Sequence, residues 1–119
     1  GKILVKKTGQ IVLFRFPQTD LNEGNLRPAL LLGRLPGEYD DWLVCMISSR
    51  TRHYISNFDE MIQENDSDFA GSVLKVSSVI RSGRLAVVDG SVIPGAIGRI
   101  SSDRLTRVKR NLSRWIEKS

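Results

Sequence analysis

Apolar residues in the first half of the chain gather into short runs that Pro, Gly and polar residues separate. The run Gln10–Phe16 is rich in β-branched and aromatic side chains and stops at Pro17, as a strand would. Pro28–Gly33 is too continuously apolar for a strand with one wet face and predicts a buried strand, and Trp42–Ser48 predicts another. Because Leu35–Asp41 carries a Pro-Gly turn signal, we expect these two strands to pair.

Shorter apolar segments follow in the second half of the chain. Gly71–Ser78, Val79–Arg81 and Arg84–Asp89 predict further short strands, which Gly83 and Gly90 punctuate. Together with the earlier runs, these segments predict a chain made mainly of short β-strands.

At the end of the chain, the hydrophobic period changes to that of an α-helix. Ser101 or Ser102 can cap its N-terminus, and Asp103 lies in the first turn, where the helix dipole favours an anion. We therefore predict a mainly β fold with α, a small twisted sheet or partly closed barrel whose open side an amphipathic helix covers, in one domain over residues 1–119. The apolar residues at helical spacing are Leu105, Val108, Leu112, Trp115 and Ile116.

Charged residues are distributed unevenly along the chain. The 119 residues carry 18 Lys and Arg against 13 Asp and Glu, a net charge of +5. Residues Ser101–Ser119 alone contribute +4, whereas Asp59–Asp68 contains five acidic residues and no basic one, with too few apolar positions to decide between a short helix and a loop. The basic balance is compatible with binding a polyanion such as RNA, although a solvated helix face would show the same pattern.

Cysteine and histidine each occur once, which excludes a disulfide framework and a metal site built on His and Cys ligands. Cys45 lies within an apolar run and is expected to be a buried small hydrophobe, and His53 in a polar stretch is expected to be a solvated loop residue. No metal or cofactor is predicted. No apolar run is long enough to span a membrane and no signal-peptide pattern opens the chain, which predicts a soluble cytoplasmic protein.

Arginines and hydroxyls beside strand ends remain as candidate chemistry, because such groups can stabilise a phosphate-centred anion without metal. The order and spacing of the segments that carry them resemble the MazF/PemK (Kid-like) toxin family. The matching segments are Gly9–Leu13 followed by Phe16-Pro17, Thr19-Asp20-Leu21, Leu26–Leu32, Val44–Ser49, Ser78–Arg81 and Ile97–Ser101 with the terminal helix.

The resemblance implies a small SH3-like barrel of the PemK/CcdB type that dimerises and acts as the toxin of a toxin-antitoxin system. Such toxins cut single-stranded RNA, including mRNA, without metal. The 2′-hydroxyl attacks the neighbouring phosphate and leaves a 2′,3′-cyclic phosphate and a 5′-hydroxyl. An antitoxin with an acidic or amphipathic segment is the implied partner.

Three catalytic residues are implied by the same resemblance. Arg27 matches the family's arginine before proline, and Ser48 stands where most members have Thr and keeps the hydroxyl. Arg81 matches an arginine of the Kid-type branch, but Gly83 stands where that branch has an acidic partner. That branch also uses a histidine in the first loop, and residues 18–25 contain none.

RNA binding is expected from polar side chains near these positions. Thr19, Asp20 and Glu23 lie in the first loop, where amide, hydroxyl and carboxylate groups can hydrogen-bond the edges of splayed bases. Ser49 and Ser78 lie beside the implied catalytic strands.

Three alternatives stay open on the sequence. The chain could be a catalytically silent member of this fold that binds antitoxin or RNA without cleavage, because acid-base partners are missing. It could instead be a gyrase-poisoning toxin of the related CcdB shape, or an unrelated small basic binding barrel.

Overall fold

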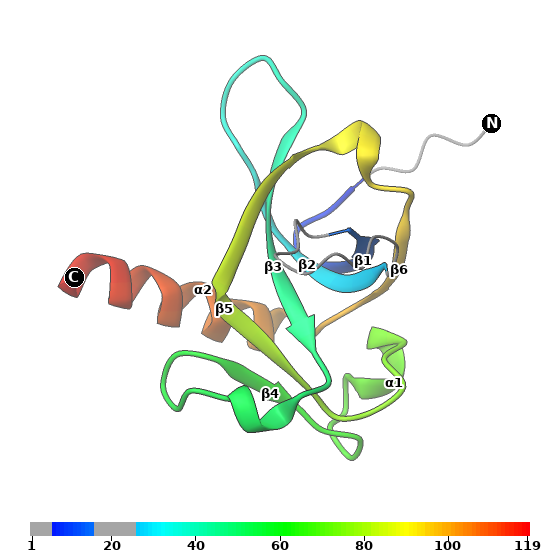
Figure 1. The fold of residues 1–119 in the computed structure, drawn as a ribbon, viewed down its shortest axis with the longest axis vertical. Helices are drawn as coiled ribbons and strands as arrows, with labels where there is room; N and C mark the ends of the chain where they lie inside the picture. The colour runs from blue at the N-terminus through cyan, green and yellow to red at the C-terminus, as the bar shows by residue number, and fades with distance from the viewer. Residues whose placement is uncertain (1–5, 16–25) are drawn as a thin grey trace, which may run out of the picture.

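The sheet of this protein is antiparallel throughout and curls into a half-barrel (Figure 1). The structure is a computed structural model that describes residues 6–15 and 26–119. Within these residues, six strands follow the order β4-β5-β3-β2-β1-β6 across the sheet. The elements in chain order are β1 (Gln10–Phe14), β2 (Arg27–Arg34), β3 (Asp41–Ser48), the 3-10 turn η1 (Thr51–His53), β4 (Glu60–Ile62), α1 (Phe69–Ser72), β5 (Ser78–Asp89), the 3-10 turn η2 (Gly90–Val92), β6 (Ala96–Arg99) and α2 (Ser102–Lys118).

The strands expected in the first half are present. β1 begins at Gln10 as predicted, and the last predicted residue of that strand, Phe16, lies outside the described residues. β2 and β3 form the expected hairpin, and Gly37 in its turn adopts a φ of +120°, a conformation that side chains disfavour. β6 was not predicted, because its four residues are mostly exposed and give no hydrophobic period.

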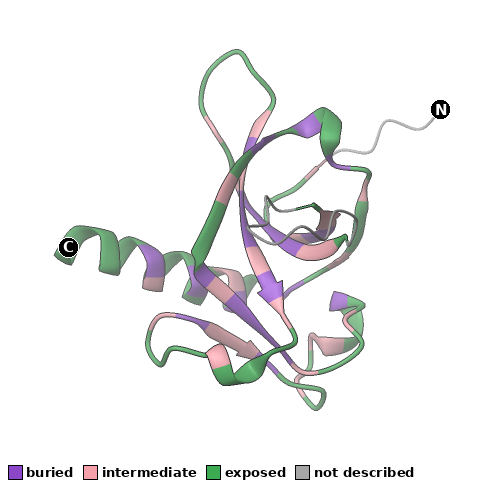
Figure 2. Cartoon of the chain, viewed as in Figure 1, coloured by how far each residue is buried: buried purple, intermediate pink, exposed green. Residues whose placement is uncertain are grey.

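The central strands bury side chains on both faces, which explains their continuous apolar runs (Figure 2). Leu30 and Cys45 belong to the cluster that also contains Val108 and Leu112 of α2. Leu31 and Val44, one residue along each strand, belong to a second cluster on the other face. The helix therefore covers one face of β2 and β3, and the curl of the sheet encloses the other.

The prediction of separate strands between residues 71 and 89 was wrong. β5 runs without a break from Ser78 to Asp89, and most of Gly71–Ser78 forms the end of α1 and a loop. Pairing with β3 jumps from Leu85 to Arg81, so Ser82–Arg84 bulges within the strand and Gly83 does not end it.

The structure also corrects the prediction for the acidic segment, residues 59–68. Neither a helix nor a loop fills residues 59–68 entirely, because β4 pairs with the start of β5 and a loop then leads to α1. Three of the five acidic side chains of this segment gather around Arg104, which is 5% exposed although the sequence pattern places it among solvated residues of the helix. Arg104 donates to both oxygens of Asp68 (2.8 and 3.0 Å), to Asp66 (2.9 Å), to Glu60 (3.1 Å) and to the Met61 carbonyl (2.6 Å).

The predicted terminal helix is confirmed. The Ser101 hydroxyl accepts a hydrogen bond from the Arg104 N–H (3.2 Å) and caps the N-terminus of α2. Val108 and Leu112 are buried, but Trp115 and Ile116 are more than half exposed at the far end of the helix. None of the helices in the described ranges is long and apolar enough to cross a membrane.

Candidate active site

The three predicted catalytic side chains lie on one face of the sheet. Ala29 of β2 pairs with Met46 of β3, and continuing this register by two residues puts Arg27 opposite Ser48. Met46 also pairs with Arg81 of β5 on its other side. Because side chains two residues apart on a strand share a face, Arg27, Ser48 and Arg81 project from the same side. Arg81 is then a diagonal neighbour of Ser48 on the adjacent strand.

A cavity of about 370 Å³ opens where β2 begins and β3 ends. Arg27 and Ser48 line it from the sheet, together with Ser49 and Ser78, whereas Arg81 is not among the described lining residues. The loop 73–76 after α1 and Ile97 of β6 also line it. The structure thus collects a guanidinium and three hydroxyls around one hollow that is mostly apolar elsewhere.

Ser48 has its hydroxyl fixed by the local turn. Its oxygen accepts a hydrogen bond from the Arg50 backbone N–H (3.1 Å), which leaves the hydroxyl proton to donate. The fold places this hydroxyl at the end of β3, where the strand leaves the sheet and enters η1. Ser48 can therefore present a donor to an oxygen in the cavity without losing its own anchoring bond.

The guanidinium of Arg27 includes a buried nitrogen for which the described residues provide no hydrogen-bond acceptor. Its Nε is buried, and no acceptor bonds to it among the described residues. Buried nitrogens of charged groups are almost always hydrogen-bonded, because desolvation without a partner costs free energy. Arg27 is suited to hold an anionic oxygen in the cavity, and its planar fork matches a phosphate.

The predicted RNA-binding residues divide into two sets. Thr19, Asp20 and Glu23 lie outside the described residues. Ser49 is exposed at the cavity, whereas Ser78 is buried and donates its hydroxyl proton to the Val76 carbonyl (2.9 Å). Ser78 therefore holds the loop 73–76, which also lines the cavity.

Lys75 is a lining residue that the sequence reasoning missed. It is exposed on the loop 73–76 and faces the cavity that Arg27 lines from the sheet. A single lysine inside the apolar stretch 73–76 was the available signal, but only the fold shows that this loop meets β2 and β3. Two cations from segments almost fifty residues apart thus border one hollow.

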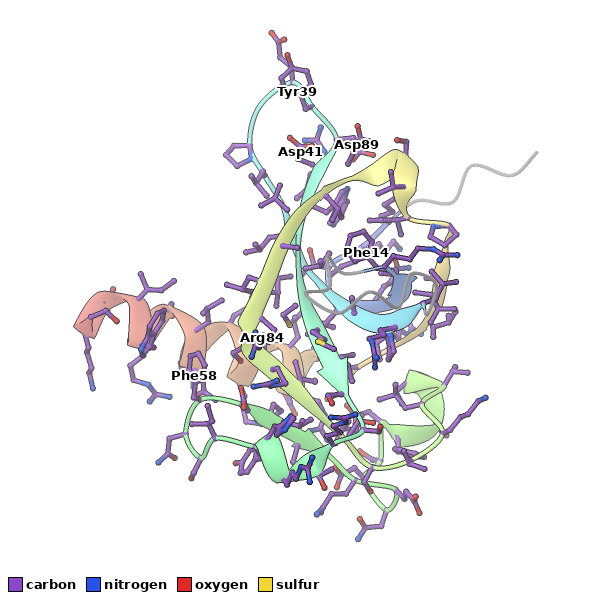
Figure 3. The ribbon with its side chains drawn as sticks, in the orientation of Figure 1. Phe14, Tyr39, Asp41, Phe58, Arg84 and Asp89 are labelled. Atoms are coloured by element: carbon purple, nitrogen blue, oxygen red, sulfur yellow. The ribbon has the colours of Figure 1, made fainter. Side chains whose placement is uncertain are left out.

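The burial of His53 was also underestimated, because the sequence predicted a solvated loop residue. His53 ends η1, which packs against β5, and its side chain is half-buried. Among the described residues, none of the ion pairs involves the arginines around it. Partial burial and then the positive charges of Arg81, Arg52, Arg50 and Arg84 lower the pKa of His53 from its ordinary 6.5 (Figure 3, where Arg84 is labelled).

Gly83 stands where the resemblance led us to expect an acidic residue, and it lies against an aromatic side chain. A Cβ at Gly83 would lie 3.2 Å from the Phe58 ring, so the aromatic side chain occupies the space next to it. The nearby carboxylate of Asp59 is 3% exposed and accepts hydrogen bonds from the Ser82 and Ile55 N–H groups, both at 3.0 Å. Asp59 locks the bulge of β5 and is turned away from solvent.

Cys45 is the buried small hydrophobe that the sequence predicted. It is fully buried, and burial together with the negative charge of Asp59 raises the pKa of its thiol to about 12. A thiol with this pKa stays protonated at neutral pH and is a poor nucleophile. The described residues hold no group of three or more His, Cys, Asp or Glu side chains arranged to bind a metal ion.

Comparison with known proteins agrees with this architecture. A family model described as PemK-like, MazF-like toxin of type II toxin-antitoxin system matches residues 7–116. Because the match covers nearly all of the 119 residues, the chain belongs to this family. No curated protein matches the chain. The protein is accordingly a toxin of a type II system, and its family implies an antitoxin as partner.

Proposed function

We propose that this member of the PemK-like, MazF-like toxin family is a metal-independent endoribonuclease that cleaves single-stranded RNA, mRNA included, at short sequences. We further propose that it acts in the cytoplasm as a homodimer built from one domain per chain. The observation that carries the cleavage proposal is that Arg27, whose buried Nε has no hydrogen-bond partner among the described residues, lines one cavity together with Ser48. This pair fits a phosphodiester better than a neutral ligand, because the guanidinium needs an anionic acceptor.

In the proposed reaction, the RNA 2′-hydroxyl attacks the adjacent phosphorus. Its proton passes to a base, the O2′–P bond forms, and the P–O5′ bond breaks as the leaving oxygen takes up a proton. The products are a 2′,3′-cyclic phosphate and a 5′-hydroxyl. Arg27 would stabilise the extra negative charge on the non-bridging oxygens, and Ser48 would donate its free proton to one of them.

His53 is our candidate for the proton-transfer group that the sequence left unassigned. Its lowered pKa keeps the imidazole neutral at physiological pH, which is the form a general base requires. It packs against the strand that carries Arg81, and Arg81 is a diagonal neighbour of Ser48. Arg81 would then attract the phosphate and keep His53 uncharged. Conversion of His53 to Gln should lower the rate and remove the acid limb of the pH profile.

Substitution of Arg27 by Ala tests the proposal directly. We expect cleavage of a single-stranded RNA in EDTA to fall about 100-fold to 1,000-fold, the usual loss when one preorganised charge stabiliser is removed. Arg27→Lys should recover only part of the rate, because an ammonium lacks the two-pronged fork. Arg110→Ala removes an equal charge from the exposed face of α2 and serves as the matched control.

Two results would contradict this assignment. Equal rates for wild-type protein and Arg27→Ala, with both folded, would exclude Arg27 from the reaction. Intact RNA with the folded wild-type protein in EDTA would favour the silent-member alternative, with which Gly83 in place of an acidic residue and the hydrogen-bonded, enclosed Asp59 are consistent.

A further inference from the structure

The loop 73–76 begins with a residue in a strained backbone conformation. Val73 has a φ of 59° and a ψ of 20°, in the left-handed region, and caps the C-terminus of α1. Asn57 is the other non-glycine residue with a positive φ in the described part of the chain, and asparagine tolerates this region better than a β-branched residue does. Backbone strain of this kind persists only where the surrounding structure enforces it, and it is commonest at ligand-binding and catalytic sites.

Contacts on both sides hold this loop in place. Before it, α1 lies beside β6 (Figure 1), and Gly98 packs so closely on α1 that a Cβ there would collide with the Ser72 carbonyl oxygen. The buried Ser72 hydroxyl accepts a hydrogen bond from the Leu74 N–H (3.2 Å). After the loop, the Ser78 hydroxyl donates to the Val76 carbonyl oxygen (2.9 Å). The loop is therefore fixed by the sheet at both of its ends.

The start of α1 is also fixed, through the N-terminus of α2. Asp68, the residue before α1, accepts a hydrogen bond from the Ser101 N–H (3.0 Å) and two from the Arg104 guanidinium (2.8 and 3.0 Å). The ion pairs of Arg104 therefore also set the position of α1 and of the loop that follows it. These anchors explain how the fold sustains the conformation of Val73.

The loop brings a second cation to the cavity that Arg27 and Ser48 line. Residues 73–76 all line this cavity, and Lys75 is exposed there. Of the described residues that line it, none is Asp or Glu, and Lys75 forms no ion pair within residues 6–15 and 26–119. The Nε of Arg27 is buried and also lacks an acceptor among these residues. Two such cations fit a ligand with more than one anionic group, such as consecutive phosphates of a nucleic-acid strand.

We propose that Lys75 binds a second phosphate of the RNA strand, next to the phosphate that Arg27 holds, and that Val73 positions Lys75 for this contact. This assignment rests on the proposed cleavage of RNA in the same cavity. Lys75 holds the strand equally before and during the reaction, so its contribution is to substrate binding and not to the chemical step. Val73 acts through Lys75, because its strained conformation directs the loop to the cavity at a cost in stability.

Substitution of Lys75 by Ala tests the phosphate contact. Binding is measured with a single-stranded 2′-fluoro RNA, which lacks the attacking hydroxyl, and kcat and KM are measured with the unmodified RNA. Lys75→Ala should weaken binding and raise KM by about 5-fold to 10-fold, with less than about a 2-fold change in kcat. The slope of log affinity against log salt should fall by about 0.7, the value for one phosphate contact on a single strand.

Two further variants serve as controls for Lys75→Ala. Lys75→Arg keeps the charge and should retain the affinity within about 2-fold. Lys109→Ala removes an equal charge from an exposed position of α2 outside the cavity and should also change the affinity by less than about 2-fold.

Substitution of Val73 by Gly separates positioning from folding. Glycine adopts a positive φ without a steric cost, so the Tm should rise by about 3 °C or more. The loop is then freer, and binding of the 2′-fluoro RNA should weaken about 3-fold despite the gain in stability. In the double variant with Lys75→Ala, the loss should be smaller than the product of the two single losses, because Val73 acts through Lys75.

The outcomes that contradict this inference differ from those that contradict the nuclease proposal. Equal affinities for Lys75→Ala and Lys109→Ala, in a protein that cleaves RNA, would overturn this inference alone. A wild-type protein that neither binds nor cleaves RNA would overturn both. Multiplicative losses in the double variant would remove Val73 from positioning. Loss of preference among RNA sequences in Lys75→Ala, with the salt slope unchanged, would assign Lys75 to a base instead of a phosphate.

Discussion

Arg104 and the arginines around His53 differ in what neutralises them. Arg104 is buried and bonded to three carboxylates and a carbonyl, all from the acidic segment of the chain. Arg81 and Arg84 lie near His53 with no ion pair among the described residues. The bonds of Arg104 fix the loops of the fold, whereas the positive charges of Arg81 and Arg84 remain available to an anion.

This difference shows that the carboxylates within bonding distance of an arginine decide whether it stabilises the fold or stays available to a ligand. Three of the five carboxylates in the densest acidic segment pair with arginines of α2, which leaves them unavailable to the rest of the surface. The strand ends near Arg27 and Arg81 therefore keep an unbalanced positive field, suited to attract a polyanion. The ion pairs of Arg104 and Arg107 thus separate cations that hold the fold together from arginines that have no ion pair among the described residues.

The largest effect expected from this contrast is on stability. Replacement of Arg104 by Met should lower the free energy of unfolding by about 3–5 kcal/mol, because it leaves a cluster of enclosed carboxylates without a counterion. Urea unfolding measures the change. Arg107→Met is the control, since the Arg107 side chain is 51% exposed and bridges only Glu60, and it should cost less than about 1 kcal/mol. Equal losses in both variants would contradict the structural role of Arg104.

Acid should unfold the protein through the same cluster. The hydrogen bonds from Arg104 lower the pKa of Asp68 to about 2, despite the opposing effect of burial. A lowered folded-state pKa stabilises the fold above the unfolded value of about 3.9, and this contribution of about 2 kcal/mol disappears as the pH falls from 4 toward 2. Unfolding free energies measured across this range test it. Asp68→Asn should flatten the dependence, and an unchanged slope in that variant would contradict the assignment.

The smallest effect concerns the unpaired arginines. Arg81→Gln should raise the pKa of His53 toward its ordinary value, because one of the positive charges that disfavour the imidazolium is removed. The chain has a single histidine, so an NMR titration reports this value without ambiguity. Stability should stay within about 0.5 kcal/mol, since Arg81 forms no described ion pair. A pKa that does not move would separate Arg81 from His53.

Regular hydrophobic patterns made much of the fold predictable. The runs 28–33 and 42–48 identified the buried hairpin, and the spacing of Val108 and Leu112 identified the helix with its cap at Ser101. Between residues 59 and 89, the local hydrophobic pattern did not predict the observed strands. Gly83 resembles a strand end in sequence, but Asp59, distant along the chain, bonds the Ser82 N–H and keeps the strand continuous.

The candidate site was predictable only in part, because its residues come from separate segments. The sequence by itself determined the mainly β architecture, the terminal helix, the buried Cys45 and the family that carries Arg27 and Ser48. Only the tertiary structure decided that Arg104 is internal, that Lys75 faces the cavity and that His53 lies among arginines. The physical reason is that hydrophobic periodicity is local, whereas the partner of a charge is set by whichever distant segment the fold brings beside it.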